Sequence, residues 1–377
     1  MATKIIIAPD KFKGSLSGID FCNIVERVLK AVVPDVNIKK LPLADGGDGT
    51  LDVLHYYLGG MLMVCTVQNP LNIPIEATYL FSENKKMAFI EMAQASGIKL
   101  LSHEQLNPLK TSTYGTGQLI LDAIKRGAKQ IILGIGGSSS NDAGMGMARA
   151  LGYQFYDDKN QELAGKGEDL QKLHRIDRSN VLSQLKDISF EVACDVDNPL
   201  FGTNGAAFIY AQQKGADAKM VQELDKGLQN FNRLIKTQFG TDLQQIKGAG
   251  AAGGLGAGSI CFLNAKLKPG IGLIKEIANF DLNIQDADWI ITGEGKFDEQ
   301  TFSGKVIKGI IESIKNQQLA VLCGISELSD HQLKKHNIHY IDQMINYASD
   351  IHDSINNSGK YLEAATLKFA KSELNVI

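Results

Sequence analysis

Short apolar runs recur at both ends of the chain, with helical patterns between them. Near the N-terminus such a run is residues 4–8 (KIIIA), with a second strand predicted over 36–43, and near the C-terminus such runs include 289–292 (WIIT) and 319–323 (LAVLC). Short runs that are apolar throughout are typical of parallel strands buried on both faces. Because helical segments separate these strands, the pattern predicts a parallel α/β sheet of the Rossmann or flavodoxin type, built from both termini.

The middle of the chain follows a different pattern. Between residues 62 and 92, three strand-like segments follow one another with only turn residues between them, which indicates antiparallel or mixed pairing. Strands and helices then alternate again. Two stretches interrupt this alternation: we expect the polar residues 154–190 to be irregular and the glycine-rich residues 248–258 to be flexible.

The length of the chain also favours two domains. It has 377 residues, of which 44% are apolar, and this is more than one average domain requires. We therefore predict an α/β protein in which residues 1–60 and 285–377 form a discontinuous parallel domain. Residues 61–284 form a mixed α/β domain inserted into it.

Composition excludes several classes of function. The formal net charge is −3 and no basic block occurs, which is atypical of a nucleic-acid-binding protein. The apolar run at the N-terminus is too short for a signal peptide, and no segment approaches the ~18–20 apolar residues of a membrane span. The five cysteines include no CxxC pair, so no zinc or redox motif is indicated. We expect a cytoplasmic protein that binds a small molecule.

Glycine-rich loops follow two of the predicted strands. The chain has no Walker A motif and no GxGxxG after its first strand, but residues 134–141 (GIGGSSSN) and 293–295 (GEG) come directly after strands. Glycines let a backbone approach phosphate closely, and a following helix N-terminus adds a favourable field. The alternative for 134–141 is a helix cap with a tight turn. The residues expected to bind nucleotide phosphate are Gly136, Gly137, Ser138, Asn141, Gly293 and Gly295.

Carboxylates recur at the ends of the predicted strands. They are Asp10, Asp45, Asp195, Glu294 and, close behind it, Asp298. One acidic residue at such a place normally caps a turn, but five beside glycine- or proline-containing loops fit a Mg²⁺ and phosphate site better. Because Mg²⁺ takes only one or two carboxylates, not all five can be ligands. The candidates for the metal are Asp195, Glu294 and Asp298.

Lysines accompany the same loops. Lys11 and Lys13 follow the first strand, and Lys296 and Lys305 lie near the last glycine loop. Phosphoryl transfer needs cations that hold the developing charge and little covalent help from the protein. Each lysine could instead be a solvated surface charge. Lys13 is the strongest candidate, because a glycine and a serine follow it directly.

Eight motifs are distributed over about 300 residues of the chain. In order they are APDKFKGSL (8–16), PLADGGDGT (42–50), IEMAQASG (90–97), TSTYGTGQLI (111–120), GIGGSSSND (134–142), ACDVDNPLFG (193–202), GAAGGLGAG (250–258) and ITGEGKFDEQTFSGK (291–305). In these motifs the chain resembles the bacterial type-1 glycerate kinases. The resemblance implies a two-domain α/β kinase with its active site in the cleft between the domains. It also implies ATP and Mg²⁺ as cofactors and D-glycerate as the substrate, generally phosphorylated on the 2-hydroxyl to give 2-phosphoglycerate.

Roles for single residues follow as expectations for an in-line phosphoryl transfer. We expect Asp195, or otherwise Asp45, to orient the attacking hydroxyl. Lys13 and Ser15 would hold the glycerate carboxylate or a transferring phosphoryl oxygen. Together the expected catalytic residues are Asp195, Lys13 and Asp45, and the expected substrate-binding residues are Ser15, Lys11, Asp48, Ser96 and Lys305.

Some residues depart from the pattern that the chain resembles. Asp48 stands where the family often has glutamate, and Lys296 stands where arginine is common, so a two-pronged donor is replaced by a point charge. Residues 46–50 (GGDGT) also match the phosphate-handling motif of the NAD and diacylglycerol kinases. Two alternatives are therefore an NAD- or lipid-kinase-like phosphotransferase and a non-catalytic sensor of glycerate or nucleotide.

Overall fold

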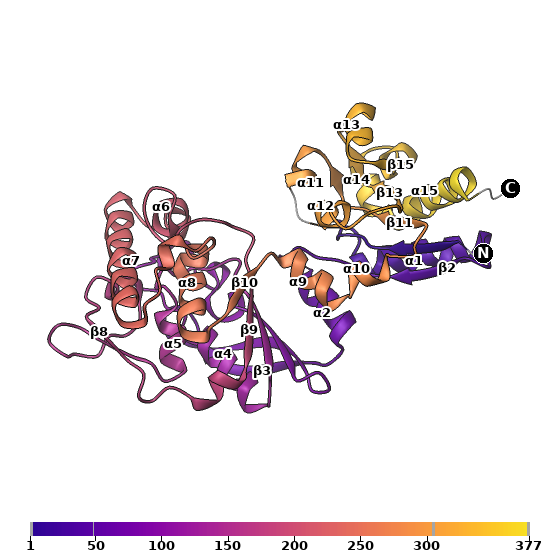
Figure 1. Cartoon of the computed structure of the whole chain (residues 1–377). Coiled ribbons are helices and arrows are strands. Elements are labelled where there is room, and N and C mark those ends of the chain that lie inside the picture. Colours follow the sequence, from indigo (N-terminus) through magenta and orange to yellow (C-terminus); the bar gives the residue numbers. More distant parts are fainter. Residues whose placement is uncertain (1–2, 48, 304–305, 375–377) are drawn as a thin grey trace. The chain divides into compact units, whose positions relative to one another are not determined.

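The computed structural model describes residues 3–47, 49–303 and 306–374 (Figure 1). Asp48 and Lys305, two of the predicted substrate-binding residues, lie outside the described residues. The chain forms two compact units. The first contains Met1–Tyr57 and Gly270–Ile377, and the second contains Leu58–Pro269. Among the described helices, none is long and apolar enough to cross a membrane.

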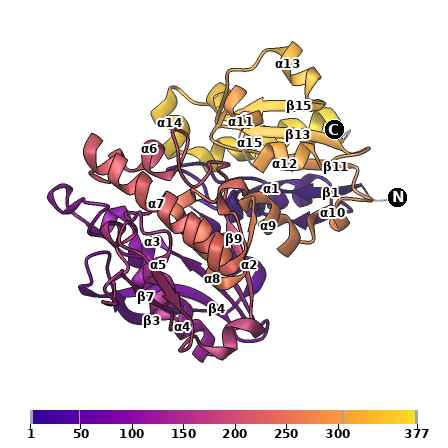
Figure 2. The ribbon, with the colours of Figure 1, turned by 60° about the vertical axis from the view of Figure 1, so that its left-hand side comes forward.

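The first unit is built on a five-stranded parallel sheet. Its strands, in spatial order, are β15 (Ile338–Gln343), β13 (Gln318–Cys323), β11 (Trp289–Thr292), β1 (Lys4–Ile7) and β2 (Asn37–Lys40). Renumbered within the unit, this is the order 2-1-3-4-5 of the flavodoxin-like folds. The N-terminal strands, indigo in Figures 1 and 2, lie beside the orange strand β11. The predicted parallel α/β sheet built from both termini is therefore confirmed.

Helices surround this sheet. They are α1 (Gly18–Val32), α2 (Thr50–Leu58), α9 (Gly270–Ile277), α10 (Phe280–Asn283), α11 (Glu299–Ser303), α12 (Val306–Ile311), α13 (Asp330–Lys335), α14 (Ile351–Asn356) and α15 (Ser358–Glu373). Helix α1 begins at Ser17, whose hydroxyl oxygen accepts a hydrogen bond from the backbone N–H of Asp20. Its apolar residues Phe21, Val25 and Leu29, spaced four apart, pack with α15 into the core beside β1.

The second unit contains a six-stranded mixed sheet. Its order is β10 (Lys266–Lys268), β9 (Ser189–Ala193), β6 (Gln130–Gly134), β5 (Met87–Glu91), β4 (Pro74–Ser82) and β3 (Met61–Gln68). The first three strands of this unit, β3 to β5, pair antiparallel, and the remaining pairs of this sheet are parallel. The predicted mixed pattern is therefore confirmed. The helices of this unit are α3 (Ala93–Ser96), α4 (Tyr114–Lys125), α5 (Met145–Ala150), α6 (Ala206–Tyr210), α7 (Ala218–Phe239) and α8 (Ala251–Leu263).

Two local predictions in this unit are wrong. The polar stretch 154–190 contains an antiparallel pair, β7 (Gln154–Tyr156) and β8 (Arg175–Asp177), so it is not wholly irregular. The glycine segment expected to be flexible runs into helix α8 and is largely buried, with left-handed backbone at Ala252, Gly253 and Gly254 before the regular helix. A Cβ on Gly256 would lie 2.4 Å from the carbonyl oxygen of Gly248, and one on Gly258 would lie 2.3 Å from that of Ala143. These glycines therefore allow close backbone packing instead of chain mobility.

Candidate active site

A cavity of 630 Å³ opens at the carboxyl ends of the strands of the first unit. The loops after β1, β2, β11, β13 and β15 line it together with helix α14. In an open parallel sheet, ligands bind at this end, where the strand order changes direction. Of the predicted site residues, the cavity brings together Lys11, Lys13, Ser15, Asp45, Glu294 and Gly295.

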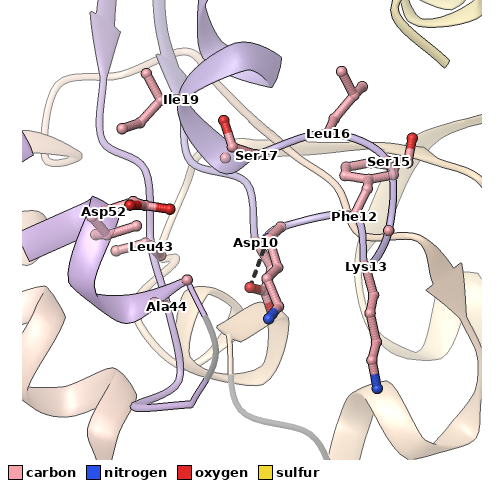
Figure 3. A pocket seen from close by; sticks show the side chains of 15 residues that line it. Asp10, Phe12, Lys13, Ser15, Leu16, Ser17, Ile19, Leu43, Ala44 and Asp52 are labelled. Carbon is pink, nitrogen blue, oxygen red and sulfur yellow. Dashed lines mark hydrogen bonds between the residues drawn. The ribbon is translucent and has the colours of Figure 1, made fainter. Parts of the chain in front are cut away.

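The loop after β1 is fixed by its backbone and by one aromatic side chain. The N–H of Asp10 donates to the carbonyl oxygen of Gly293 over 2.9 Å, which joins this loop to the loop after β11. Phe12 is buried and stacks on Phe21 with ring centroids 5.4 Å apart. Lys13 is exposed, and its side chain leaves the loop in the same direction as that of Asp10 (Figure 3). The loop therefore holds a cationic group on a rigid support.

Ser15, predicted to bind substrate, also has a structural contact. Its hydroxyl donates to the backbone carbonyl of Ile355 in α14 over 3.2 Å. The loop after β1 is thereby joined to α14, and the remaining lone pairs of the hydroxyl can still accept a hydrogen bond.

Asp45 lies on the loop after β2. Its Oδ1 accepts a hydrogen bond of 2.9 Å from the backbone N–H of Gly47, which fixes a local turn. The backbone of this loop packs closely on the start of α9: a Cβ on Gly270 would lie 2.0 Å from the carbonyl oxygen of Asp45. The glycine at position 270 therefore permits the observed position of Asp45.

Glu294 is a carboxyl group of the first unit whose pKa is strongly raised. Burial raises its pKa to about 7. A hydrogen bond from the hydroxyl of Thr301 opposes this rise, and the nearby negative charges of Asp10 and Asp298 add to it. A carboxyl group raised by burial and by like charges is typical of functional sites, because a bound cation would relieve both effects.

The lysine next to Glu294 is engaged in ion pairs. Lys296 Nζ lies 3.1 Å from a carboxylate oxygen of Asp298 and 3.0 Å from one of Glu327. These carboxylates raise its pKa. Lys296 therefore screens the charge of Asp298 at the edge of the cavity.

The carboxylates of the first unit fit Mg²⁺ only in part. Within the described residues, no three histidine, cysteine, aspartate or glutamate side chains are assembled as a ready-made metal site. Mg²⁺ usually binds through one or two carboxylates, with phosphate oxygens and waters completing its shell. Glu294 and Asp298, which interact electrostatically, are suited to that arrangement. The third predicted ligand, Asp195, is an exposed residue of the second unit, in the segment after β9.

In the predicted phosphate loop of the second unit, Ser138, Ser139, Ser140 and Asn141 are buried, whereas Gly136 and Gly137 are exposed. Ser139 donates twice to the backbone carbonyl of Ser96, from its N–H and from its hydroxyl, both over 3.0 Å. Ser96 itself, predicted to bind substrate, is fully buried, and its hydroxyl oxygen lies 2.7 Å from that of Thr116. The buried Ser96 therefore holds this loop in place through the two hydrogen bonds that its carbonyl accepts from Ser139.

Lys214 was not identified from the sequence. It is fully buried, and its Nζ donates to the Ser138 hydroxyl and to the Ser140 carbonyl, both over 2.7 Å. Burial lowers its pKa to about 7, and the charge of Asp142 opposes this. The sequence around it, AQQKGA, contains no pattern that distinguishes it from a surface lysine.

Asp142, at the end of this loop, is a second buried ionisable residue besides Lys214. Its carboxylate accepts hydrogen bonds from the N–H and the hydroxyl of Thr113, both over 2.7 Å, and from the N–H groups of Gly144 and Gly146. Burial raises its pKa, while these hydrogen bonds oppose the rise. The carboxylate therefore connects the loop to the starts of α4 and α5.

Helix α8 packs against the same loop at its glycine-rich start. The N–H of Ala143 donates to the Gly253 carbonyl over 3.1 Å, and a Cβ on Gly253 would lie 2.1 Å from the Ser140 carbonyl oxygen. Ala143 and Ala252 both have left-handed backbones, with φ of 51° and 53°. Such strain in non-glycine residues is concentrated at functional sites.

Three polar side-chain atoms in this loop lack a hydrogen-bond partner within the described part of the chain. The Ser140 hydroxyl and both amide atoms of Asn141 are buried and have no hydrogen-bond partner among the residues that the structure describes. Buried polar atoms without partners are uncommon, and a functional role or a bound water or ion is a usual explanation for them. Gly136 and Gly137 precede them, and no side chain blocks a Cβ position at Gly136. The loop is therefore suited to bind an anion.

Comparison with known families agrees with these features. The model of the Glycerate kinase family matches residues 5–372. The chain belongs to the glycerate kinase family. As a member of this family it is a kinase, and the GGDGT motif at 46–50 lies within the sequence that the family model matches, so it no longer favours an NAD or lipid kinase.

Individual members of the glycerate kinase family are similar over most of their length. A glycerate kinase of Bacillus subtilis (strain 168) is 39% identical, and the alignment covers 98% of this chain and 99% of that protein. A glycerate 2-kinase of Escherichia coli (strain K12) is 41% identical over 87% of this chain and 86% of its own. The crystal structure of a protein of Salmonella typhimurium LT2, named as a candidate glycerate kinase 2, has a TM-score of 0.89 at 35% identity. It covers 100% of this chain and 99% of its own.

Proposed function

We propose that this protein transfers the terminal phosphoryl group of ATP to the 2-hydroxyl of D-glycerate, giving 2-phosphoglycerate and ADP. The observation that carries the proposal is the gathering of Lys13, Asp45 and Glu294 in one cavity at the carboxyl ends of a parallel sheet. The family supports the substrate, and the name of the Escherichia coli relative, a glycerate 2-kinase, supports the 2-hydroxyl.

The cations of the cavity suit the charge that develops during the transfer. In an in-line reaction the glycerate oxygen forms a bond to the γ-phosphorus as the bond to the bridging oxygen of ADP breaks. Lys13 would donate to an equatorial phosphoryl oxygen or to the glycerate carboxylate, with Ser15 beside it. Lys11, which lines the same cavity, adds positive charge.

Glycine loops would hold the ATP phosphates. Gly293 and Gly295 lie on the loop joined to Asp10, so backbone N–H groups of this loop are close to Lys13. In the second unit, Gly136, Gly137, Ser138 and Asn141 form the other proposed phosphate loop. The buried polar atoms of Ser140 and Asn141 support this assignment.

Mg²⁺ fits the acidic residues beside the cavity. Glu294 would bind it, with Asp298 as the second candidate, since relief of the burial of Glu294 and of the repulsion between the two carboxylates would favour a cation. When bound, Mg²⁺ would neutralise negative charge on the phosphate oxygens. Asp195 remains a further proposed ligand from the second unit.

A carboxylate would receive the proton of the attacking hydroxyl. We place Asp195 first and Asp45 second in this role, because both lie in segments that directly follow strands, β9 and β2. The variants Asp195→Asn and Asp45→Asn keep the shape of the side chain and remove the proton acceptor. Near-normal turnover in Asp195→Asn would exclude it from this role.

The decisive experiment uses the purified protein with Mg²⁺, ATP and D-glycerate, and follows the product by phosphorus NMR. We expect the resonance of 2-phosphoglycerate. A resonance of 3-phosphoglycerate would instead show that the 3-hydroxyl is the one phosphorylated. Binding of ATP and glycerate without any phosphorylated product would instead indicate a non-catalytic sensor.

A further inference from the structure

The cavity of the first unit has two chemically different ends. Lys13, Asp45 and Glu294 line it from the loops after β1, β2 and β11. The apolar residues Ile325, Met344, Ile345, Ile351 and Ile355, called here the apolar end, line it from the loops after β13 and β15, on the other side of the strand order, and from α14. The whole cavity measures 630 Å³, within the range of sites that hold a drug-sized ligand. Glycerate, with three carbons and polar groups on each, would fill a small part of this volume and would have no favourable contact at the apolar end.

Helix α14 supplies the most exposed part of the apolar end. Ile351 and Ile355 are 54% and 42% exposed although both are large and apolar. They are four residues apart and so lie on the same face of the helix. Both line the cavity, so their exposed surface is directed into a space that a ligand can occupy.

The apolar end is connected to the loops that carry the polar end. The N–H of Ile325 donates to the Gly295 carbonyl over 3.1 Å, and the N–H of Ile345 donates to the Gly324 carbonyl over 3.0 Å. On the other side, the Ser15 hydroxyl donates to the Ile355 carbonyl. Hydrogen bonds within one unit therefore join the loops of the apolar end directly to those of the polar end.

We propose that the apolar end is the site for the purine base of the nucleotide donor, whose phosphates extend toward Gly295 and Lys13. This inference rests on the proposed function, because it takes the donor to be a nucleoside triphosphate. A purine is a flat apolar ring with polar edges. Isoleucine side chains suit its faces, and the hydroxyls of Ser354 and Ser358, which line the same cavity, suit its edges.

The position of the cavity in the sheet supports a nucleotide. The neighbours β1 and β11 mark the switch point of the strand order, from which β2 lies on one side and β13 and β15 lie on the other. In flavodoxin-like sheets this switch point is where nucleotide-type ligands bind. The cavity includes the loops after both of these strands.

The test is a pair of substitutions that remove apolar surface and leave the phosphate end intact. In the double variant Ile351→Asn/Ile355→Asn, we expect the Kd for ADP and the KM for ATP to rise roughly 10–100-fold. The KM for glycerate and the Kd for inorganic tripolyphosphate, which has no base, are expected to change little. Since both isoleucines are exposed, the fold should be retained, which circular dichroism would check.

A matched control is Leu282→Asn in α10 of the same unit, because Leu282 is 66% exposed and does not line the cavity. An unchanged affinity for ADP in the double variant would overturn the inference, as would an equal loss of affinity for tripolyphosphate. Failure of the proposed function is a separate result: the unmodified protein would form no phosphoglycerate with ATP, whatever the effect of the double variant on ADP binding.

Discussion

The ammonium group of Lys214 lies 2.7 Å from the hydroxyl oxygen of Ser138, and both residues are buried in the second unit. The contact spans 76 positions of the sequence. It places a cation directly beneath the loop that we propose to bind phosphate. Because burial lowers the pKa of Lys214 to about 7, the charge of this support depends on pH in the range where enzymes work.

Lys214 should make the stability of the protein depend on pH. Between pH 7 and about 10.5, the unfolded lysine carries a proton that the folded one has lost, so stability rises with pH across this window. In Lys214→Met this contribution is absent. We expect the urea midpoint of the unmodified protein, relative to that of the variant, to be higher at pH 9.5 than at pH 7.

The control for Lys214 is Lys236→Met in the same unit. Lys236 is exposed and pairs with Asp242 over 2.8 Å, so its substitution should shift the midpoint equally at both pH values. A constant difference between the unmodified protein and Lys214→Met would show that Lys214 keeps an ordinary pKa.

Glu294→Gln should reduce activity and raise stability. Because Glu294 is a proposed ligand of Mg²⁺, its replacement should lower turnover roughly 10–100-fold. Its pKa of about 7 in the folded protein means that at pH 8 a buried carboxylate opposes folding, whereas below pH 4.5 the group is neutral in both states. The variant should therefore have the higher Tm at pH 8 and an equal Tm near pH 4.5.

Glu299→Gln serves as the control for Glu294, because Glu299 is an exposed residue of the neighbouring helix α11. It should change neither the turnover nor the pH dependence of Tm. If Glu294→Gln kept full turnover, the carboxylate would have no part in the reaction.

Two glycines of helix α9 form a matched pair. A Cβ on Gly270 would meet the Asp45 carbonyl oxygen at 2.0 Å, whereas one on Gly272 meets nothing within 4 Å. We expect Gly270→Ala to destabilise the protein by about 1–3 kcal/mol and to lower turnover through displacement of Asp45. Gly272→Ala should instead stabilise it by about 0.5–1 kcal/mol with turnover unchanged. Thermal unfolding and steady-state kinetics of both variants test this. Equal stability and equal turnover of the two variants would contradict the close packing of Gly270 on Asp45.

Lys13→Ala should affect function without affecting stability. Lys13 is exposed on a loop that Phe12 anchors, so its removal leaves the core intact. Removing one charge that stabilises the transferring phosphoryl group should lower kcat/KM roughly 100–1,000-fold. Steady-state kinetics and a thermal melt give the two measurements.

The matched variant for Lys13 is Lys30→Ala in α1. Lys30 is exposed and pairs with Glu26 over 2.8 Å, an interaction worth less than about 1 kcal/mol. It should retain full activity. If Lys13→Ala left both Michaelis constants and turnover unchanged, Lys13 would not contact substrate or phosphate.

Much of the fold could be predicted because its signals are local. The runs that became β1, β11 and β13 are continuous and apolar, since strands in the centre of a parallel sheet are covered on both faces. The same rule located the cavity residues Asp45 and Glu294, because residues after parallel strands meet at one edge of the sheet.

The wrong prediction for residues 248–258 and the failure to identify Lys214 have a common physical cause. Glycines of residues 248–258 were interpreted as flexible, yet composition does not reveal which backbone will approach each one. Lys214 was missed because its buried state depends on Ser138 and Ser140, which are remote in sequence. The assignments of Asp48 and Lys305 fall on residues that the structure does not describe, and they stay predictions.

The pairing of β1 with β11 also affects the order in which the chain can fold during synthesis. Ile5 lies beside Trp289, and all of Leu58–Pro269 is translated between them. The second unit is thus complete, and able to fold, while the strands at the N-terminus still lack their central partner. Because domains tend to fold as they emerge from the ribosome, β1 and β2 can pair with each other early, but β1 must wait for β11 through most of translation.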